Sequence, residues 1–495
     1  MKKLLLVIYI FSIFYITSCT LYKKPEVPSI KMPNQFKPTI KITNAKLKEK
    51  WWENFHDAEL NRLVELAVIN NYSYQIALKN IQIACTYVTQ NLSGLFPQVN
   101  LGFNSTRNKF NSVAFGGSFA NPSTVSSNTH VFNLQQLNGT VAYQVDIWNQ
   151  IRNSVNQAKA NQDASIADSN VMKLTLITSV VDTYFQIVTL NANLHNLNEQ
   201  YKLANEIVRL INTQFQSGLI DASALDNAKN QAETIKININ NLKKQKEVLQ
   251  YTLAYLLGEY PEHFKLGNNF KSFQVKNLVP PSIPAEMMAN RPDIQEAYYQ
   301  ILSYGYLEKQ NIANFLPNIS LTGNYGYEST ALSNLLSSAN TYWTYGLYAT
   351  QFVFDYQTRM SEYRRSKYQY ESAILNFKNT VLNAFKEVDS ALSSYKEDNE
   401  ALIAYQKQTV NSKDLLGLAN SQYRSGLIDY STYLTTNLSY LQSSFNVANQ
   451  KLVVAEDIFQ IYKTLGLGLY SHTSITIRKC HADHIFRCNK NRYRI

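Results

Sequence analysis

Apolar residues recur at intervals of three and four in two long stretches of the chain. They are Val171, Leu174, Val181, Phe185, Val188 and Ala192, with Thr178 among them, and then Ile374, Phe377, Val381, Ala384, Val388, Ala391 and Tyr395. This spacing places one apolar seam along a helix. No proline interrupts residues 147–260 or 318–495. We therefore predict two helices of about 70 residues, each roughly 105 Å long, which need antiparallel partner helices along their length.

Four other segments alternate between apolar and polar residues with a period of two. The segments are approximately residues 98–106, 136–146, 318–327 and 342–354. Runs of this length with one apolar face and many Tyr and Trp residues are typical of transmembrane β-strands, although a soluble antiparallel sheet would show the same alternation. No apolar run of 18 residues or more follows the N-terminal apolar run, so we expect no helical membrane span.

An octapeptide occurs twice in the chain, which indicates an internal duplication. Residues Gln214–Asp221 reappear 208 positions later as Gln422–Asp429, with six of the eight residues identical. We therefore divide the body into a first structural repeat at 51–258, a linker at 259–284 and a second repeat at 285–468. The repeats agree in length after their sheet segments and differ within them, as expected for rigid helices and tolerant hairpin loops.

Each octapeptide is predicted to form the turn of a helical hairpin. The glycines suit a helix C-terminus, where a left-handed residue is favoured, and the aspartates suit the N-cap of the returning helix. Leucine and isoleucine between them place apolar side chains on an exposed tip, which indicates a docking partner. The predicted docking residues are Gly218, Leu219, Ile220, Asp221, Gly426, Leu427, Ile428 and Asp429.

The N-terminus is typical of a bacterial lipoprotein. A charged start, an apolar run and small residues form a signal peptide at 1–18, and Cys19 follows directly. Cleavage before Cys19 would allow its lipidation; a plain signal peptide with a chance cysteine is the alternative. Thr20, in place of Asp, favours the outer membrane. Residues 19–50 carry four prolines at 25, 28, 33 and 38, and suit an extended tether.

The basic charge of the chain lies mostly at its ends. Residues 471–495 carry six Lys or Arg against Asp483, and Lys2 and Lys3 leave with the signal, so the formal +11 falls to +4 for the body. This distribution argues against nucleic-acid binding.

Within the tail, 469–495, the spacing of Cys480, His481, His484 and Cys488 matches no common zinc site. We expect a disordered tail, no metal and no cofactor.

The residue types also exclude most enzymes. The chain has seven His, and no nucleophile motif or phosphate-binding loop is present.

Four strands cannot close a barrel, and open edges are not tolerated in lipid, so several chains must pool their strands. Three chains would give twelve strands around an open lumen. A structural coiled-coil lipoprotein without a pore shares the helical pattern and is kept as the alternative.

The chain resembles the outer-membrane efflux channel family, the TolC-like and OprM-like outer membrane factors, in its lipoprotein branch. The resemblance covers residues of about 19–468. Its markers are Trp51-Trp52, Phe96-Pro97, Leu316-Pro317, Asn290 to Ile294, Phe352 to Asp355, the paired Gly-Leu-Ile-Asp tips, and Leu465 to Gly468. Within them, Arg291, Pro292 and Asp293 place a proline at a helix start with an acid in the first turn.

The resemblance implies an α+β membrane protein: long antiparallel helical hairpins that form an α-barrel, and four strands per chain in a trimeric 12-stranded β-barrel. It implies a homotrimer in the outer-membrane lipid, anchored at Cys19 and extending into the periplasm. A periplasmic adaptor would dock at the tips and an inner-membrane pump would drive transport, or the chain would be a type I protein-secretion channel. The family often narrows its closed end with acids after the second tip; this chain has Thr at 432, 435 and 436, so we place a possible aperture at Asp226.

Overall fold

The computed structural model describes residues 24–28, 50–111, 129–263, 291–355 and 357–469, together with 266, 288 and 290. The chain divides into two compact units, which are described separately. The first unit comprises residues 1–28, 82–163 and 298–375 and contains the sheet. The second comprises 29–81, 164–297 and 376–495 and contains the helical tips. Cys19 and the tail beyond residue 469 lie outside the described residues.

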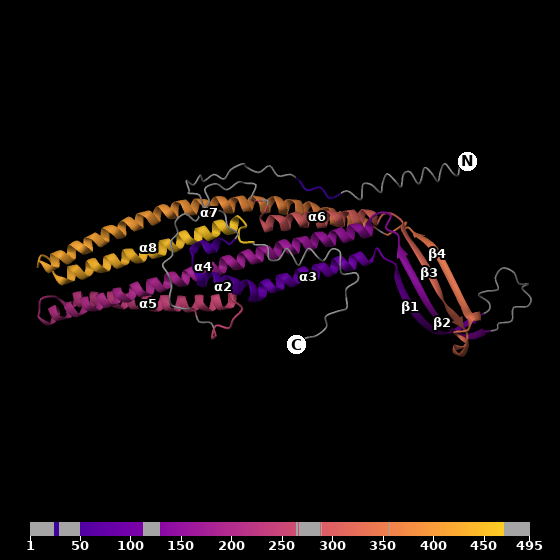
Figure 1. Ribbon diagram of the computed structural model, residues 1–495, viewed down its shortest axis with the longest axis horizontal. Coiled ribbons are helices and arrows are strands. Elements are labelled where there is room, and N and C mark those ends of the chain that lie inside the picture. The colour runs from indigo at the N-terminus through magenta and orange to yellow at the C-terminus, as the bar shows by residue number, and fades with distance from the viewer. Residues whose placement is uncertain are drawn as a thin grey trace, which may run out of the picture. The chain divides into compact units, whose positions relative to one another are not determined.

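Helices form most of the described chain (Figure 1). The α-helices are α2 (Ala58–Asn70), α3 (Tyr72–Ser93), α4 (Gln150–Gln216), α5 (Ala222–Leu256), α6 (Pro292–Ala313), α7 (Thr358–Arg424) and α8 (Tyr430–Thr464). Three short 3-10 helices are also described, η1 (Trp51–Phe55), η5 (Leu332–Asn334) and η6 (Ser338–Asn340). α4 and α7 are each 67 residues long, close to the length that the apolar seams predict.

The internal duplication is visible in the helix boundaries. The offset of 208 residues between the two octapeptides also separates both ends of α4 from those of α7, and both ends of α5 from those of α8. α3 and α6 have 22 residues each. Glycine and aspartate fix the tip boundaries locally in both copies. The two repeats therefore share one plan of a short helix, a strand hairpin and a long helical hairpin.

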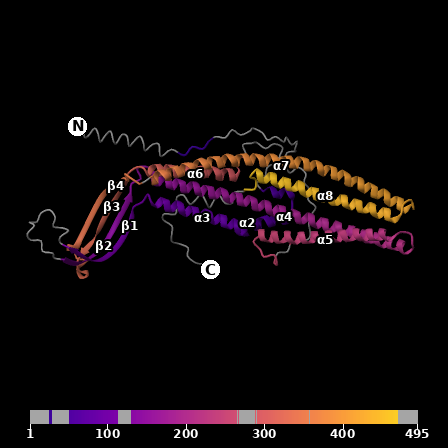
Figure 2. The ribbon, with the colours of Figure 1, turned by 180° about the vertical axis from the view of Figure 1, so that it is seen from behind.

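The sheet has four antiparallel strands in the order of the sequence, and they lie side by side in Figures 1 and 2. They are β1 (Gln98–Asn111), β2 (Thr129–Gln144), β3 (Asn318–Ser329) and β4 (Thr341–Thr350). β2 begins seven residues earlier than predicted, because its pairing with β1 continues past the end of the apolar alternation. β4 ends at Thr350, so the predicted extension to Phe354 is wrong: Phe352 and Phe354 follow the strand and are exposed.

The seam predicted for α7 is a narrow buried stripe. Six of its seven predicted residues, from Phe377 to Tyr395, are buried. α4 is buried more broadly, because Ile177, Val180 and Ile187 outside the predicted seam are also inaccessible to solvent. One stretch of α4 is long and apolar enough to cross a membrane by composition, but most of it is buried inside the protein. We therefore assign it to the core.

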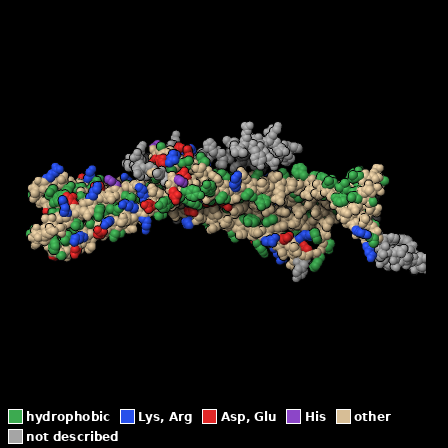
Figure 3. All heavy atoms as spheres, turned by 90° about the horizontal axis from the view of Figure 1, so that it is seen from below, with side chains coloured by type: hydrophobic (Ala, Val, Ile, Leu, Met, Phe, Trp, Pro, Cys, Tyr) green, Lys and Arg blue, Asp and Glu red, His purple; other side chains and the backbone are tan. Residues whose placement is uncertain are grey.

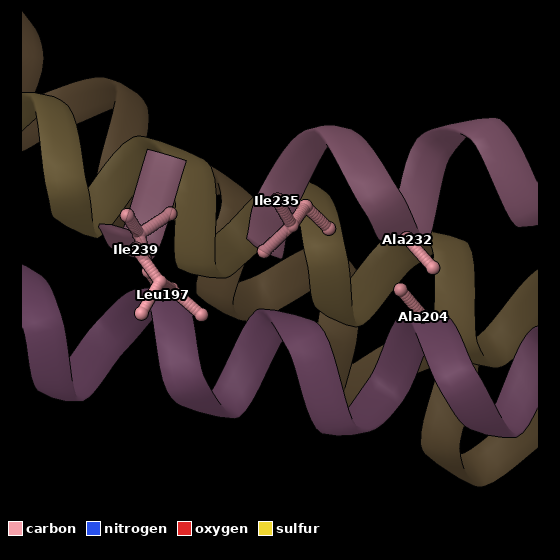
Figure 4. Close-up of a cluster of buried hydrophobic side chains, with 5 residues drawn as sticks. All are labelled: Leu197, Ala204, Ala232, Ile235 and Ile239. Atoms are coloured by element: carbon pink, nitrogen blue, oxygen red, sulfur yellow. The ribbon is translucent and has the colours of Figure 1, made fainter. Parts of the chain in front are cut away.

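Aromatic side chains form the centre of the second unit. Trp51 and Trp52 are fully buried, and the ring of Trp51 stacks on that of Tyr462 at 5.0 Å with an interplanar angle of 6°. Further along the first helical hairpin, α4 and α5 meet through small and branched residues, as Figure 4 shows. Leu197 and Ala204 of α4 face Ala232, Ile235 and Ile239 of α5.

A short N-terminal segment lies against α6 and α7 in the first unit. The Lys24 ammonium donates a 2.9 Å hydrogen bond to the Tyr298 hydroxyl, and the Tyr370 hydroxyl donates one to the backbone oxygen of Glu26. Pro25 is buried against Gly305, where a Cβ would collide with the proline ring. A glycine in α6 therefore makes room for the segment.

Candidate functional site

The two hairpin tips have the same backbone geometry. Gly218 and Gly426 both have a φ of +73°, which favours glycine, and each follows the last helical turn. The next residue closes the turn: Leu219 donates its backbone N–H to the Gln214 oxygen, and Leu427 donates to the Gln422 oxygen, both at 2.9 Å. This is the six-to-one hydrogen bond of a Schellman motif, which ends a helix at a left-handed glycine.

Aspartate begins the returning helix at both tips. The Asp221 carboxylate accepts from the Ala224 backbone N–H at 3.0 Å, and the Asp429 carboxylate accepts from that of Thr432 at 2.6 Å. Hydrogen bonds from Ser223 and from Thr432 hold the pKa of the respective aspartates below the ordinary value. The N-cap role expected from the sequence is thus confirmed for both residues.

The apolar residues of the tips divide into two kinds. Leu219 and Leu427 are each 74% exposed, whereas Ile220 and Ile428 are half-buried. The expectation that all four residues are exposed holds only for the leucines, because the protein partly covers the isoleucines. The exposed apolar surface of each tip is therefore centred on one leucine.

A mixed apolar and tyrosine cluster joins the two hairpins near their tips. Ile207 of α4, Ala228 of α5 and Leu434 of α8 are buried together, with Tyr430 and Tyr433 packed against them. The Tyr430 hydroxyl donates a 2.6 Å hydrogen bond to the carboxylate of Glu206 on α4, and this bond raises the pKa of Tyr430 to about 12. Glu206 and Tyr430 therefore tie the second hairpin to the first.

The sheet has one apolar and one polar face, as the alternation predicts. Strand register places the odd-numbered residues together: Val99, Leu101, Phe103, Leu137, Val141, Tyr143, Ile319, Leu321, Tyr325, Tyr327, Trp343, Tyr345 and Leu347. Many of them are exposed, Tyr345 to 78% and Leu101 to 81%. The even-numbered residues form the opposite face, where the Thr140 hydroxyl donates to the Asn324 amide oxygen. An exposed aromatic and aliphatic face suits lipid, and a polar face suits water.

The central part of the sheet carries no charge. No Asp, Glu, Lys, Arg or His occurs within 98–104, 136–144, 318–326 or 341–350, on either face. Charged residues of the strands, such as Arg107 and Lys109, lie beyond the apolar band. On the molecular face in Figure 3, the sheet is accordingly covered by hydrophobic and uncharged side chains, with basic ones only near its end.

The remaining predicted residues lie apart from the tips' apolar surface. Asp226 is on α5, with a side chain that is 69% exposed and 3.6 Å from the Lys229 ammonium. Arg291 precedes α6, which begins at Pro292, and its side chain is buried. The guanidinium donates to Asp293 at 2.7 Å, to Glu387 at 2.8 Å and to the Thr464 backbone oxygen at 2.7 Å. Arg291 therefore joins the start of α6 to α7 and to the end of α8.

A group of acids in the second unit was missed by the sequence analysis. Asp182 of α4 and Glu456 of α8 are hydrogen-bonded to each other, and the Gln186 amide donates to both at 3.2 Å. Asp457 is hydrogen-bonded to Asp398 of α7. Burial raises the pKa of Asp182 and Glu456, and burial together with the Asp398 charge raises that of Asp457 to about 7. These residues are far apart in sequence, so no local motif marks them.

The chain matches the model of one protein family in both repeats. The model, described as outer membrane efflux protein, matches residues 63–259 and 283–467. The chain belongs to this family. Its members are outer-membrane efflux channels rather than enzymes, so the predicted outer-membrane efflux channel is confirmed at the level of the family.

Relatives in the outer membrane efflux protein family align over nearly the whole chain. Toxin and drug export protein A of Aggregatibacter actinomycetemcomitans is 26% identical over 93% of this chain and 98% of its own length. The pyoverdine export outer membrane protein OpmQ of Pseudomonas putida is 24% identical, over 87% of this chain and 90% of its own length. The probable efflux pump outer membrane protein TtgC of the same species is also 24% identical, over 93% and 95%.

Solved structures of outer-membrane channels have the same fold. The CmeC outer membrane channel of Campylobacter jejuni superposes with a TM-score of 0.77 at 25% identity, over 90% of this chain and 96% of that one. The outer-membrane channel OprN gives a TM-score of 0.78 at 22% identity, over 90% and 99%. The predicted α+β class, with long helical hairpins and a small antiparallel sheet, is therefore confirmed.

Proposed function

We propose that the chain is the outer-membrane channel of a tripartite export system, assembled as a homotrimer. Its sheet carries the proposal, because it has an apolar face, a polar face and an uncharged centre. Its two edge strands, β1 and β4, each pair with only one other strand in the described chain. Unpaired backbone groups are too costly to leave in lipid. In a trimer, β1 of one chain would pair with β4 of the next and close a barrel of twelve strands.

The long helices support lateral association of several chains. α7 carries a second set of apolar residues, separate from its buried seam and in one heptad register: Tyr368, Leu375 and Leu382, and then Ile403 and Val410 after two charged positions, Asp389 and Lys396. The apolar side chains of this set are between 45% and 69% exposed in the single chain. A heptad row of this kind packs against a neighbouring helix. We infer that helices of adjacent protomers cover it and complete a helical tunnel in the periplasm.

The N-terminal segment supports a lipid anchor at Cys19. Residues 24–28 are fixed against α6 and α7, which lead directly into the sheet. Cys19 is six residues before Pro25, so it lies within about 20 Å of that point even with the chain fully extended. Acyl chains on Cys19 would enter the same leaflet that surrounds the base of the sheet.

The tips are the proposed docking surface for a periplasmic adaptor, which would connect the channel to an inner-membrane pump. Leu219 and Leu427 supply the exposed apolar surface, and rigid Schellman turns present them.

Conduction through the channel would be passive. Opening would separate the second hairpin from the first, so the Glu206–Tyr430 hydrogen bond would hold the closed state. Asp226, exposed on α5, remains the candidate for an acidic aperture.

One relative favours a second candidate cargo class. Toxin and drug export protein A is named for the export of a toxin as well as drugs. A type I protein-secretion channel would use the same barrel and tunnel, with a polypeptide in place of a small molecule. Transport assays with each cargo class would separate the two functions.

Light scattering and ion conductance of the detergent-purified protein test the proposal. We expect the mass of three chains, and discrete conductance steps after insertion into a planar bilayer. A monomer without conductance would contradict the channel and favour a coiled-coil lipoprotein. Trimers without conductance would support the assembly but would reject an open path in the wild-type protein; Tyr430→Phe, which weakens the contact between the hairpins, would then be recorded under the same conditions.

A further inference from the structure

Amide side chains gather where the sheet meets the helices in the first unit. β1 begins five residues after α3 ends, and α4 begins six residues after β2 ends. Antiparallel pairing places Gln98 opposite Ala142, and Gln144 opposite Ser320. The residues at these chain ends therefore surround one volume, although they come from four different elements.

This volume is a cavity of about 720 Å³, within the size range of small-molecule sites. Its polar lining includes Gln90, Gln98, Gln144, Gln150, Ser154 and Gln310. Phe96 and Tyr143 supply apolar surface. No Asp, Glu, Lys, Arg or His is among the described residues that line it. The cavity therefore offers hydrogen bonds and ring contacts but no fixed charge.

One wall of the cavity is fixed by hydrogen bonds between amides. The Gln144 side chain donates to the Gln150 amide oxygen at 3.1 Å, and Gln150 donates to that of Asn314 at 2.6 Å. The Ser154 hydroxyl donates to the Asn91 amide oxygen. These contacts hold side chains of β2, α3 and α4, and that of Asn314 directly after α6, in position. A preformed wall costs less conformational entropy when a solute binds.

Three other glutamines in the lining have unused amide groups. Within the described part of the chain, the side chains of Gln90, Gln98 and Gln310 make no hydrogen bond with protein groups. Each amide can donate two hydrogen bonds and accept two. A neutral solute with several hydroxyl or amide groups would satisfy them. A charged solute would lose hydration without meeting an opposite charge, which is unfavourable.

The cavity opens on the polar face of the sheet, whose central part is uncharged. Gln98, Ala142, Gln144 and Ser320 belong to its even-numbered positions. A solute moving along this face meets no ionised group until Glu328, which accepts a hydrogen bond from Gln136. In the barrel of the proposed function, this face lines the path of conduction. The location of the cavity on that path rests on the proposed function, whereas its chemistry does not.

We propose that the cavity is a binding site for neutral solutes that carry several hydroxyl or amide groups, and that it selects them over charged solutes of the same size. A neutral trisaccharide has suitable groups and serves as the probe. The test uses saturation-transfer NMR on the full-length, detergent-solubilised protein with maltotriose. Maltotrionate, its aldonic acid, is the charged probe of nearly equal size.

We expect saturation transfer to maltotriose and an affinity for maltotrionate about tenfold lower. The double variant Gln98→Leu/Gln310→Leu should bind maltotriose about tenfold more weakly, because two hydrogen-bonding groups are lost. Thr344→Val lies on the same polar face outside the cavity lining and should bind as the wild type does. The single variant Gln310→Lys should reverse the preference toward maltotrionate.

Three results would overturn the site. The first is no saturation transfer to maltotriose, and the second is that the double variant binds maltotriose as tightly as the wild type does. The third is that the wild type binds maltotrionate as tightly as maltotriose, or more tightly. Conductance of the same wild-type preparation separates this failure from that of the proposed function. Conductance without sugar binding rejects the site and keeps the channel. Sugar binding that depends on Gln98 and Gln310, without conductance in any variant, keeps the site and rejects the channel.

Discussion

At the scale of single residues, the acids between α4, α7 and α8 are the least expected feature of the second unit. Asp457 is hydrogen-bonded to Asp398, and its charge interacts with those of Asp398 and Glu456. The Gln450 amide donates to Asp398. No cation forms an ion pair with Asp182, Asp398, Glu456 or Asp457 among the described residues. Burial and like charges therefore favour the protonated carboxyl of Asp457.

This geometry predicts a stability that falls as pH rises. Asp457 has a folded pKa of about 7, above its ordinary value, so between about pH 4 and 7 the folded state holds a proton that the unfolded chain has lost. The free energy of unfolding decreases over that window, and the loss is complete above pH 7. Asp457→Asn keeps a neutral side chain and should stabilise the protein at pH 8 by about 1 kcal/mol, with little change at pH 4.

Thermal unfolding at pH 4 and pH 8 measures this effect. Asp414→Asn changes an exposed aspartate on α7 and is the matched control. It should keep the wild-type difference between the unfolding midpoints at the two pH values. Asp182 and Glu456 remain in the Asp457 variant, so its pH dependence should shrink rather than vanish. An unchanged difference in Asp457→Asn would show that this carboxyl is already ionised in the folded state.

A second residue-scale prediction concerns Arg291. Replacing it with Met keeps an apolar stem but removes the donor to Glu387 Oε2 and to the Thr464 backbone oxygen. Because the arginine is buried and Glu387 is partly exposed, we expect a loss of about 2–3 kcal/mol in the free energy of unfolding. Arg62→Met breaks an exposed pair with Glu59 and should cost less than about 0.5 kcal/mol. Equal losses in urea unfolding would contradict the role of Arg291.

At the scale of the elements, local signals explain what the sequence could predict. The ends of the long helices follow from Gly218, Gly426, Asp221 and Asp429, whose preferences depend on their own backbone positions. Strand faces follow from alternation, which lies within each strand. Strand ends were less accurate, because β2 continues where the apolar band stops and only its hydrogen-bonded partner in β1 defines its start.

Contacts between distant elements were beyond these signals. Glu206 and Tyr430 are 224 positions apart, and neither has a sequence neighbour that marks the pair. The same holds for the cavity, whose glutamines come from separate strand and helix ends. Single amides and carboxylates are common on helix surfaces, so only the fold reveals which of them meet. The candidate site was therefore predictable at its turns and not at its long-range contacts.

The contact between the hairpins yields a prediction on the closed state. Tyr430→Phe removes the hydroxyl that donates to Glu206 but keeps the ring in the cluster with Tyr423 and Tyr433. Loss of about 1 kcal/mol should shift the closed-to-open ratio roughly fivefold. Single-channel recording in planar bilayers should show a higher open probability. Tyr433 belongs to the same cluster, and its hydroxyl makes no hydrogen bond within the part of the chain that the structure describes. Tyr433→Phe should therefore behave as the wild type; equal open probabilities of the two variants would contradict the role of the Glu206–Tyr430 contact.

The tips yield a prediction on docking. Leu427→Ser removes the exposed apolar group of the second tip without changing the glycine turn, so export should fall at least about tenfold while trimers persist. Leu332→Ser changes a leucine of similar exposure, 64%, between β3 and β4 and serves as the control. Drug accumulation in cells that carry each variant gives the readout. Full export by Leu427→Ser would assign docking to another surface.

At the scale of the whole molecule, attachment to the membrane has two separable sources. The apolar face of the sheet would hold the trimer in lipid, and acyl chains on Cys19 would add a second anchor close to the fixed segment at Lys24–Pro28. A closed barrel with an apolar belt resists extraction by itself, whereas a lipid chain alone binds a membrane only marginally. Removing the lipid therefore distinguishes a channel from a lipid-tethered helical rod.

Cys19→Ser prevents lipidation, and alkaline carbonate extraction of the isolated membranes measures what remains. We expect the variant to stay in the membrane pellet, since its strands are inserted, and to lose incorporation of labelled palmitate. The wild type with an intact Cys19 is the control for labelling. Release of the variant into the soluble fraction would mean that the lipid is the sole attachment, and the exposed face of β1 to β4 would then need a protein partner rather than a bilayer. Unchanged palmitate incorporation would move the lipid to another residue and leave the fixed segment at Pro25 as a purely structural contact.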